Sequence, residues 1–178
     1  MKKILLKNLP KYIHISKNNN FLLNKIKQIK NTIKPNGLYY SYGVEWIKYL
    51  TDILNIKYIK ITNKYIYYTK IKLYKLIISN KYKTNINKSS NKNKILIIRS
   101  FNELSIFHNK YKYKNNNIIN WIKVSNKYGG FGFTKNYVNI QNKIYINKSF
   151  NNPLLWATSF DVSGGCIWNN KLLKYSIL

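Results

Sequence analysis

The sequence VEWIKYLTDIL at residues 44–54, followed by NIKYIKITNKYIYYTKIKLYKLIIS at residues 55–79, decides the predicted fold. In the first part Val44, Ile47, Leu50, Ile53 and Leu54 recur at helical spacing on one face, which predicts an amphipathic helix. In the second part Ile, Tyr and Lys nearly alternate, which predicts two or three strands. The change from one period to the other within a short stretch indicates an α+β fold.

The residues before this stretch complete an N-terminal α/β lobe. Phe21 to Ile33 also carries apolar residues at helical spacing, and the sequence Pro-Asn-Gly at residues 35–37 ends that pattern. We therefore expect residues 21–79 to form two helices and a three-stranded sheet. Residues 1–20 are basic and end in Lys-Asn-Asn-Asn, which predicts an extended basic arm.

The second half of the chain divides into two parts. Residues 80–117 are rich in Lys and Asn and predict an insertion between two lobes, with a short strand at Ile95–Ile98 and a short helix or turn at Phe101–His108. Residues 118–178 predict a C-terminal lobe that is mostly β. Its expected strands lie at residues 118–124, 131–133, 138–140, 144–146 and 154–157, and a polar loop follows at residues 158–165.

Charge is the strongest indication of function. The chain has 32 basic and 4 acidic residues, a formal net charge of +28, and its basic residues extend from Lys2 to Lys174. A compact domain with this much like charge is destabilised by self-repulsion and attracts polyanions. An AT-rich genome accounts for the abundance of Lys, Asn, Ile and Tyr, but it does not account for the scarcity of Asp and Glu. We therefore expect a phosphate-rich partner.

The kind of basic residue favours RNA over duplex DNA. Arg99 is the single Arg, whereas Arg is the residue that most often reads guanine in the DNA major groove. Lys next to Tyr recurs, as at Lys11-Tyr12 and Lys57-Tyr58. Lys supplies phosphate contacts and Tyr can stack on unpaired bases, although Tyr is also an ordinary strand former with a polar tip. Binding dominated by Lys is typical of backbone and shape recognition in structured RNA.

Enzyme and metal sites have weak support in the sequence. The four acidic residues lie far apart, whereas general acid–base catalysis usually needs a paired carboxylate or an oriented His. Cys166 is the single Cys, so no intramolecular disulfide forms, and His14 and His108 alone could join it in a zinc site. The glycine-containing runs at residues 129–132 and 163–166 match no phosphate-binding or nucleophile motif. We expect no enzyme activity, no cofactor, no metal and no small-molecule substrate.

The compartment is indicated by what the sequence lacks. It shows no secretory signal, and no apolar run approaches the roughly 18 residues of a membrane span. A single Cys is typical of a reducing compartment. Together with the AT-rich codon usage, this predicts an organelle-encoded protein of the mitochondrial matrix, with the plastid as the alternative.

Three stretches, taken in order, resemble one family, ribosomal protein eight of the small subunit. Residues 22–31 are similar to the basic first helix of that family. Residues 41–59 are similar to its second helix with the flanking segments, and residues 122–131 are similar to its strand-turn-strand. The resemblance covers residues 21–78 and 118–178.

A loop near the C-terminus adds to this resemblance. Leu-Trp-Ala-Thr-Ser at residues 155–159 resembles the hydroxyl-bearing loop that meets the RNA minor groove in the family, and residues 163–165 are a competing match. Ala157 and Phe160 depart from the family pattern, which has Ser and Lys there. Small hydroxyl residues and glycines let the backbone approach ribose 2′-hydroxyl groups.

The resemblance implies a structural constituent of the organellar small ribosomal subunit. Such a protein binds and stabilises the central domain of the small-subunit ribosomal RNA and contacts neighbouring ribosomal proteins. The RNA-binding residues that it implies are Lys25, Lys27, Lys30, Lys34, Ser125, Lys127, Thr158, Ser159, Ser163, Gly164 and Gly165.

Two other functions stay open on the sequence. One is a different organellar ribosomal protein, because composition alone does not separate members of this class. The other is a basic, membrane-associated subunit of an organellar complex whose Lys-rich face meets anionic lipid. A nuclease is disfavoured, because the sequence has no cluster of carboxylates that would hold its metal.

Overall fold

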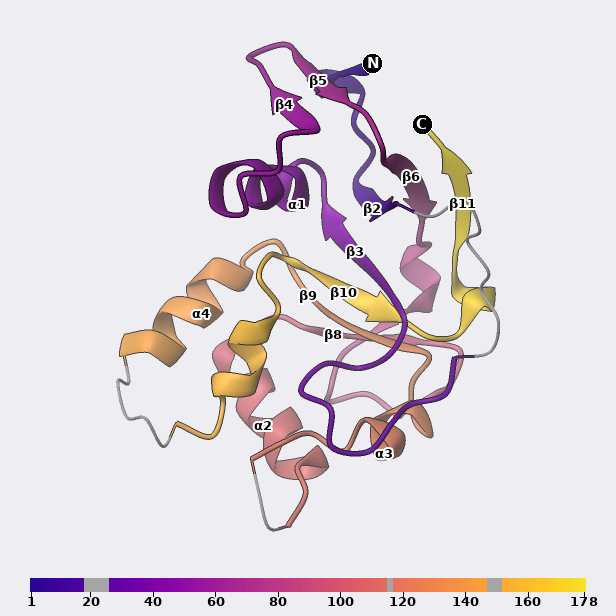
Figure 1. The fold of residues 1–178 in the computed structure, drawn as a ribbon. Coiled ribbons are helices and arrows are strands. Elements are labelled where there is room, and N and C mark those ends of the chain that lie inside the picture. The colour runs from indigo at the N-terminus through magenta and orange to yellow at the C-terminus, as the bar shows by residue number, and fades with distance from the viewer. Residues whose placement is uncertain (18–25, 115–116, 147–151) are drawn as a thin grey trace.

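The computed structural model describes residues 1–17, 26–114, 117–146 and 152–178. The protein has the α+β fold that the sequence predicted, built around a strongly curled sheet (Figure 1). Most neighbouring strands of this sheet pair antiparallel, whereas β7 pairs in parallel with β8, and β8 with β9. In the described residues the strand order is β11 (Lys174–Ile177), β6 (Lys72–Ile77), β2 (Tyr12–Ser16), β3 (Leu38–Tyr42), β10 (Gly164–Ile167), β9 (Gly130–Phe133), β8 (Ile95–Ile98) and β7 (Lys83–Thr84).

A smaller antiparallel sheet packs against the outer face of β2 and β6. Its strands are β1, β5 and β4 in that order, and a short helix, α1, continues into a π-helix, η2, beside them (Figure 1). Ile47, Ile66 and Leu73 are buried between these elements and belong to one core cluster. The bounds are β1 Lys2–Leu5, β4 Ile59–Ile61, β5 Tyr65–Tyr68, α1 Glu45–Lys48 and η2 Tyr49–Ile53.

An aromatic core lies on the face of β8, β9 and β10 that the longer helices cover (Figure 1). Phe107, in the middle of α2, is fully buried, and its ring centroid lies 4.8 Å from that of Phe131 and 5.8 Å from that of Trp156. The helical elements here are α2 (Phe101–Tyr111), α3 (Trp121–Ser125), α4 (Tyr137–Ile146) and the 3-10 helix η4 (Leu155–Ser159).

A separate core fills the inside of the curled sheet. Because side chains alternate along a strand, Ile95 and Ile97 of β8 point into the curl, while Leu96 and Ile98 join the aromatic core. The 3-10 helix η5 (Asn170–Leu172) contributes Leu172 to this core. Leu172 lies inside the curl, close to the ends of β8 and β9 where Ile95 pairs with Gly130. Two further 3-10 helices, η1 (Leu6–Asn8) and η3 (Asn80–Tyr82), connect strands.

Glycines let the central strands β3, β9 and β10 approach one another closely. A Cβ atom on Gly164 would lie 1.9 Å from the carbonyl oxygen of Tyr40, and one on Gly165 would lie 2.4 Å from that of Phe131. Both glycines are buried in β10. Gly164 and Gly165 therefore belong to the middle of the sheet, and Ser163 beside them is buried, so these residues do not form the exposed loop that the sequence predicted, whereas RNA contact through them stays a prediction.

Several elements were predicted correctly. The helix expected at residues 44–54 is present as α1 and η2, and the strands expected within residues 55–79 are β4, β5 and β6. The strand at Ile95–Ile98 and the helix at Phe101–His108 are also confirmed as β8 and α2. The agreement is in the type of element more than in the buried face, because Ile47 is buried in α1 whereas Ile53 and Leu54 are 68% and 50% exposed.

Residues 118–178 are not mostly β, in contrast to the prediction. The strand expected at 118–124 overlaps the helix α3, whose first turn is capped by the Asn120 side chain accepting from the backbone N–H of Lys123 at 2.9 Å. The expected strands at 138–140 and 144–146 are one helix, α4. Its buried residues Tyr137, Ile140 and Ile144 lie on one helical face. This spacing was missed because the strands were predicted from segments of only three residues, which are rich in β-branched and aromatic residues.

The helix predicted over residues 21–33 is not present in the part that the structure describes. Residues 18–25 lie outside the described residues, and residues 26–33 form a loop. The Gln28 side chain explains the loop, because its Nε2 donates to the carbonyl of Asn36 at 2.7 Å and its Oε1 accepts from the N–H of Asn36 at 2.8 Å. Asn31 also has a φ of 58°, which a right-handed helix does not allow.

The N-terminal segment and the middle segment belong to the sheets and the core, in contrast to the prediction. Residues 1–17 supply β1 and β2 and are therefore part of both sheets rather than an arm. Residues 80–117, expected as an insertion, include β8 and α2, whose side chains form much of the aromatic core. The Lys- and Asn-rich composition at residues 80–94 led to the prediction of an insertion, although the core elements β8 and α2 follow directly. No helix in the described ranges is both long and apolar enough for a membrane crossing.

Candidate nucleic-acid interface

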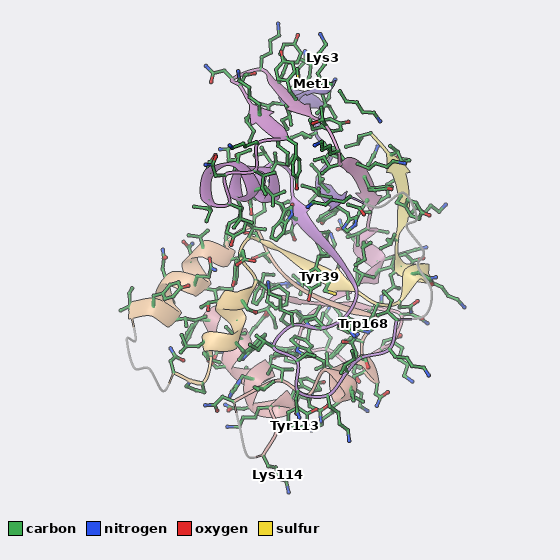
Figure 2. The ribbon with its side chains drawn as sticks, in the orientation of Figure 1. Met1, Lys3, Tyr39, Tyr113, Lys114 and Trp168 are labelled. Atoms are coloured by element: carbon green, nitrogen blue, oxygen red, sulfur yellow. The ribbon has the colours of Figure 1, made fainter. Side chains whose placement is uncertain are left out.

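Positive charge surrounds the whole molecule. Figure 2 places Lys3 and Lys114 at opposite ends of the protein, which agrees with the spread of Lys along the sequence. Within the described residues one ion pair is present, between Lys34 Nζ and Asp161 Oδ2 at 3.2 Å. Nearly all of the lysines therefore have no carboxylate partner within the described part of the chain. Their charge is locally concentrated where several of them line one groove.

One such site is a groove beside the ends of β2, β3, β8 and β9, which we name the Lys11 groove. It has a volume of about 590 Å³, and its described lining contains four cations and no carboxylate. The cations come from four separate segments that the curl of the sheet brings together. The lining residues are Lys11, Tyr12, Tyr42, Lys83, Ile97, Arg99, Thr134 and Lys135.

Lys83 is held in place within this groove. Its Nζ donates to the hydroxyl oxygen of Tyr12 at 2.5 Å and to Oδ1 of Asn80 at 2.8 Å, and it lies 4.9 Å from the centroid of the Tyr12 ring. The Nζ of Lys11 lies 5.6 Å from the same centroid. Two ammonium groups therefore flank one buried tyrosine, and at least one of them has a fixed position.

The tyrosines contribute hydroxyl groups to the groove rather than open ring faces. Tyr12 and Tyr42 are 4% and 7% exposed, so stacking on a base is not available to them. Burial raises the pKa of Tyr42, and the neighbouring Tyr12 and Glu45 raise it further. The hydroxyl of Tyr42 consequently stays protonated at neutral pH and can donate to an anion.

Two carboxylates lie near the groove without lining it. Glu45 is close enough to Tyr42 to affect the pKa of its hydroxyl. Glu103 accepts a hydrogen bond from the backbone N–H of Arg99 at 2.8 Å, and its own N–H donates to Oγ of Ser100 at 3.2 Å. This reciprocal pair caps the start of α2. Glu103 is therefore engaged in capping the first turn of the helix, and the groove itself remains basic.

A second basic groove, which we name the Lys27 groove, lies near η5 and α3. It has a volume of about 780 Å³, and Lys27, Lys92 and Lys171 line it without any described carboxylate. All three lysines are exposed. Asn169 also lines this groove, but its Nδ2 donates to the carbonyl of Lys92 at 3.0 Å and is therefore already engaged within the protein.

The sequence-predicted site residues are only partly brought together. Lys27 and Ser125 both line the Lys27 groove, whereas Lys30 and Lys127 are exposed elsewhere and Lys34 pairs with Asp161. Lys25 lies outside the described residues. None of these residues lines the Lys11 groove.

The stretch predicted to carry the hydroxyl loop, residues 155–159, is a 3-10 helix, η4. Thr158 Oγ1 donates to the carbonyl of Leu155 at 2.7 Å, and the Oγ atom of Ser159 is buried. Ser163 is 1% exposed and donates to the carbonyl of Lys135 at 3.0 Å. Thr158 and Ser159 keep partial exposure, so RNA contact through them stays a prediction, whereas Ser163 is part of the core.

The residues of the Lys11 groove were missed because they are far apart in the sequence. Lys11-Tyr12 stood out as one of several Lys-Tyr pairs, but nothing in the sequence joins it to Lys83 or Lys135. The contact depends on the curl of the sheet, which brings the edge strand β7 back to β2. A local pattern carries no information about such a closure.

Comparisons of the chain with protein-family models, with curated proteins and with solved structures find no match. Within the described part of the chain, no three His, Cys, Asp or Glu residues come together as potential metal ligands.

Proposed function

We propose that this protein binds RNA through its phosphate backbone, with the Lys11 groove as the principal site. The observation that carries the proposal is the convergence of Lys11, Lys83, Arg99 and Lys135 in one groove whose described lining has no carboxylate. Phosphate contacts of this kind position a nucleic acid and dominate its affinity.

Pre-organisation favours the Lys11 groove over the Lys27 groove. Lys83 is half-buried and fixed by hydrogen bonds to Tyr12 and Asn80, so binding a phosphate costs it little further side-chain entropy. The lysines of the Lys27 groove are exposed and lose more freedom on binding. The Lys27 groove then serves as a second, weaker contact.

Shape favours RNA over an anionic membrane surface. The cations of the Lys11 groove lie in a concave site, where they surround a phosphate from several sides, whereas lipid headgroups present a flat layer. Arg99 is the single cation there that can contact a phosphate in a bidentate manner, and the remaining cations act as point charges. This predicts binding with little base specificity.

The narrower assignment, a structural constituent of an organellar small ribosomal subunit, is supported by the sequence resemblance and by the charge. On this proposal the RNA is the central domain of the small-subunit ribosomal RNA. Its test is co-sedimentation of the chain with the small subunit in a sucrose gradient. Recovery only in the ribosome-free fractions would reject the ribosomal assignment and leave RNA binding to be tested on its own.

The RNA-binding proposal is tested by comparing three triple variants that each remove three positive charges. We expect the set in the Lys11 groove to weaken binding to a structured RNA most, measured by fluorescence anisotropy at about 150 mM salt. The sets are Lys11, Lys83 and Lys135; Lys27, Lys92 and Lys171; and Lys57, Lys60 and Lys143, each changed to Gln.

The third set is the control, because its lysines are exposed on η2–β4 and α4 and line neither groove. Equal losses in all three sets would mean that net charge alone drives binding, which would contradict the proposed site. A parallel titration with phosphatidylserine vesicles separates the membrane alternative. Tighter binding to the vesicles than to RNA would reject the proposal.

A further inference from the structure

A different concave site lies where β2 and β3 separate. In the described residues these strands pair at Tyr12–Tyr42 and Ile13–Ser41, and the ring of His14 occupies the gap beyond, with its Nδ1–H donating to the carbonyl of Tyr39 at 2.6 Å. The divergence opens a cavity of about 300 Å³, which we name the His14 cleft. Its chemically informative lining residues are His14, Lys34, Ser41, Trp46, Phe160 and Asp161.

Ser41 is the first indication that the cleft takes a ligand. Its side chain is 2% exposed, and its Oγ has no hydrogen-bond partner in the described structure. Tyr40 and Tyr42, its neighbours on β3, point into the curl, so Ser41 points to the opposite face, where the cleft lies. A buried hydroxyl without a partner is costly, and a ligand that hydrogen-bonds to it recovers that cost.

The rim of the cleft offers one group of each charge. Lys34 Nζ and Asp161 Oδ2 lie 3.2 Å apart, and their side chains are 37% and 29% exposed. Desolvation, and secondarily the nearby Asp161, raises the pKa of the Tyr49 hydroxyl, so η2 brings this hydroxyl close to the carboxylate. A ligand at this rim therefore meets an ammonium suited to an anionic group and a carboxylate suited to hydroxyl or amino donors.

The walls are aromatic and apolar. Trp46 lines the cleft and stacks on Tyr49 with ring centroids 5.5 Å apart and an interplanar angle of 23°. Phe160 lies 6.3 Å from the ring of Tyr39, which Figure 2 shows in the middle of the molecule, between the small sheet and the helices of the aromatic core. Most of the lining side chains are apolar or aromatic, which is typical of a cleft that takes a planar ring.

We propose that the His14 cleft binds a nucleoside monophosphate. The base would lie among the aromatic walls, the phosphate would meet Lys34, and Asp161 and Ser41 would hydrogen-bond the polar groups of the sugar or base. The volume is at the lower end of the roughly 300–1,000 Å³ typical of ligand sites, so a mononucleotide fits and a folded RNA does not. The net charge of +28 favours an anionic ligand. This site is independent of the Lys11 groove and of RNA binding.

The test is isothermal titration calorimetry of the full chain with AMP, GMP and UMP, each at up to several millimolar. We expect saturable binding of at least one of them and weaker binding of adenosine and of inorganic phosphate. Lys34→Gln should weaken the nucleotide roughly tenfold or more, because a charge-assisted hydrogen bond is lost. Trp46→Leu should weaken it as well. Lys83→Gln, which changes the Lys11 groove, should leave the affinity within about twofold.

Several outcomes would overturn the proposal. Absence of binding for all three nucleotides is one, and equal affinity for inorganic phosphate alone is another. A loss caused by Lys83→Gln with no change in Lys34→Gln would assign the phosphate to the Lys11 groove instead. Lys34 is partly exposed, so its variant is expected to fold, and circular dichroism checks this for every variant. RNA affinity measured on the same samples shows separately whether the RNA proposal stands.

Discussion

Lys83 Nζ and the hydroxyl oxygen of Tyr12 lie 2.5 Å apart, and this hydrogen bond joins the edge strand β7 to β2 across the open side of the curled sheet. The two residues are 71 positions apart in the sequence. Their contact has two consequences. It helps to close the curl, and it fixes an ammonium group in the Lys11 groove.

The first prediction concerns this contact. Tyr12→Phe removes the hydroxyl and keeps the ring, so we expect a loss of about 1 kcal/mol in the free energy of unfolding, measured by urea denaturation. Tyr65→Phe is the matched control, because the Tyr65 hydroxyl has no hydrogen-bond partner in the described structure. A wild-type urea midpoint for Tyr12→Phe would show that the contact does not stabilise the curl.

The second prediction concerns the close packing of β3 and β10. Gly164→Ala would place a Cβ 1.9 Å from the carbonyl oxygen of Tyr40, so we expect a loss of about 3 kcal/mol or more, or failure to fold. Gly43→Ala is the comparison, because nothing lies within 4 Å of its Cβ position and the cost is the strain of a φ of +51°. We expect that cost to be about 1–2 kcal/mol. The reverse order of the two losses in thermal or urea unfolding would contradict the packing described here.

The third prediction tests whether α2 belongs to the core. Phe107→Ala removes a fully buried ring that contacts Tyr111, Trp121, Phe131 and Trp156, and we expect it to cost about 3–5 kcal/mol. Ile106→Ala, one position away and 40% exposed, should cost less than about 1 kcal/mol. Urea unfolding gives both values. Similar small losses would support the peripheral insertion that the sequence predicted for residues 80–117.

The fourth prediction concerns acid stability. His108 is buried, and its Nδ1 accepts a hydrogen bond from Nε1 of Trp156 at 3.1 Å, so the ring is neutral in the folded protein. Burial, and secondarily Lys112, lowers the pKa of His108 from 6.5 to about 4. Between these values the unfolded chain binds a proton that the folded chain does not. Stability should therefore fall as the pH falls from about 6.5 to 4, by at most about 3 kcal/mol from this group.

The measurement is urea unfolding at pH 7.5, 6, 5 and 4.5 for the wild type and for His108→Gln. The variant should lose less stability on acidification than the wild type. Some pH dependence should remain, because burial also lowers the pKa of His14. An identical slope in the two proteins would contradict the assignment of the effect to His108.

Local patterns in the sequence predicted the elements whose apolar period is unambiguous. The run Ile95–Ile98 is uniformly apolar and became the fully buried strand β8, and Val44 to Leu54 became a helical segment. In α4, by contrast, Tyr, Val and Ile dominate, and these residues favour strands in isolation. The helix forms because burying Tyr137, Ile140 and Ile144 against the aromatic core outweighs that preference.

The candidate sites were beyond the reach of local patterns for a different reason. Positive charge predicted a polyanion, but lysines are found over most of the sequence, so their density does not identify a site. Lys11, Lys83 and Lys135 converge only because the sheet curls, and Ser41 gains its significance only because it is buried without a partner. Gly164 and Gly165 illustrate the converse, since small residues that resemble an exposed loop in sequence let strands pack closely.

The salt dependence of RNA binding tests the central claim most directly. The slope of log Kd against log salt concentration should be measured between 50 and 300 mM salt for the wild type and for the variant with Lys11, Lys83 and Lys135 changed to Gln. Each phosphate contact contributes about 0.7 to the slope on a single strand and about 0.9 on a duplex, so we predict that the slope falls by about 2 to 3 in this variant. An unchanged slope in this variant, with a reduced slope when Lys57, Lys60 and Lys143 are changed instead, would contradict the account.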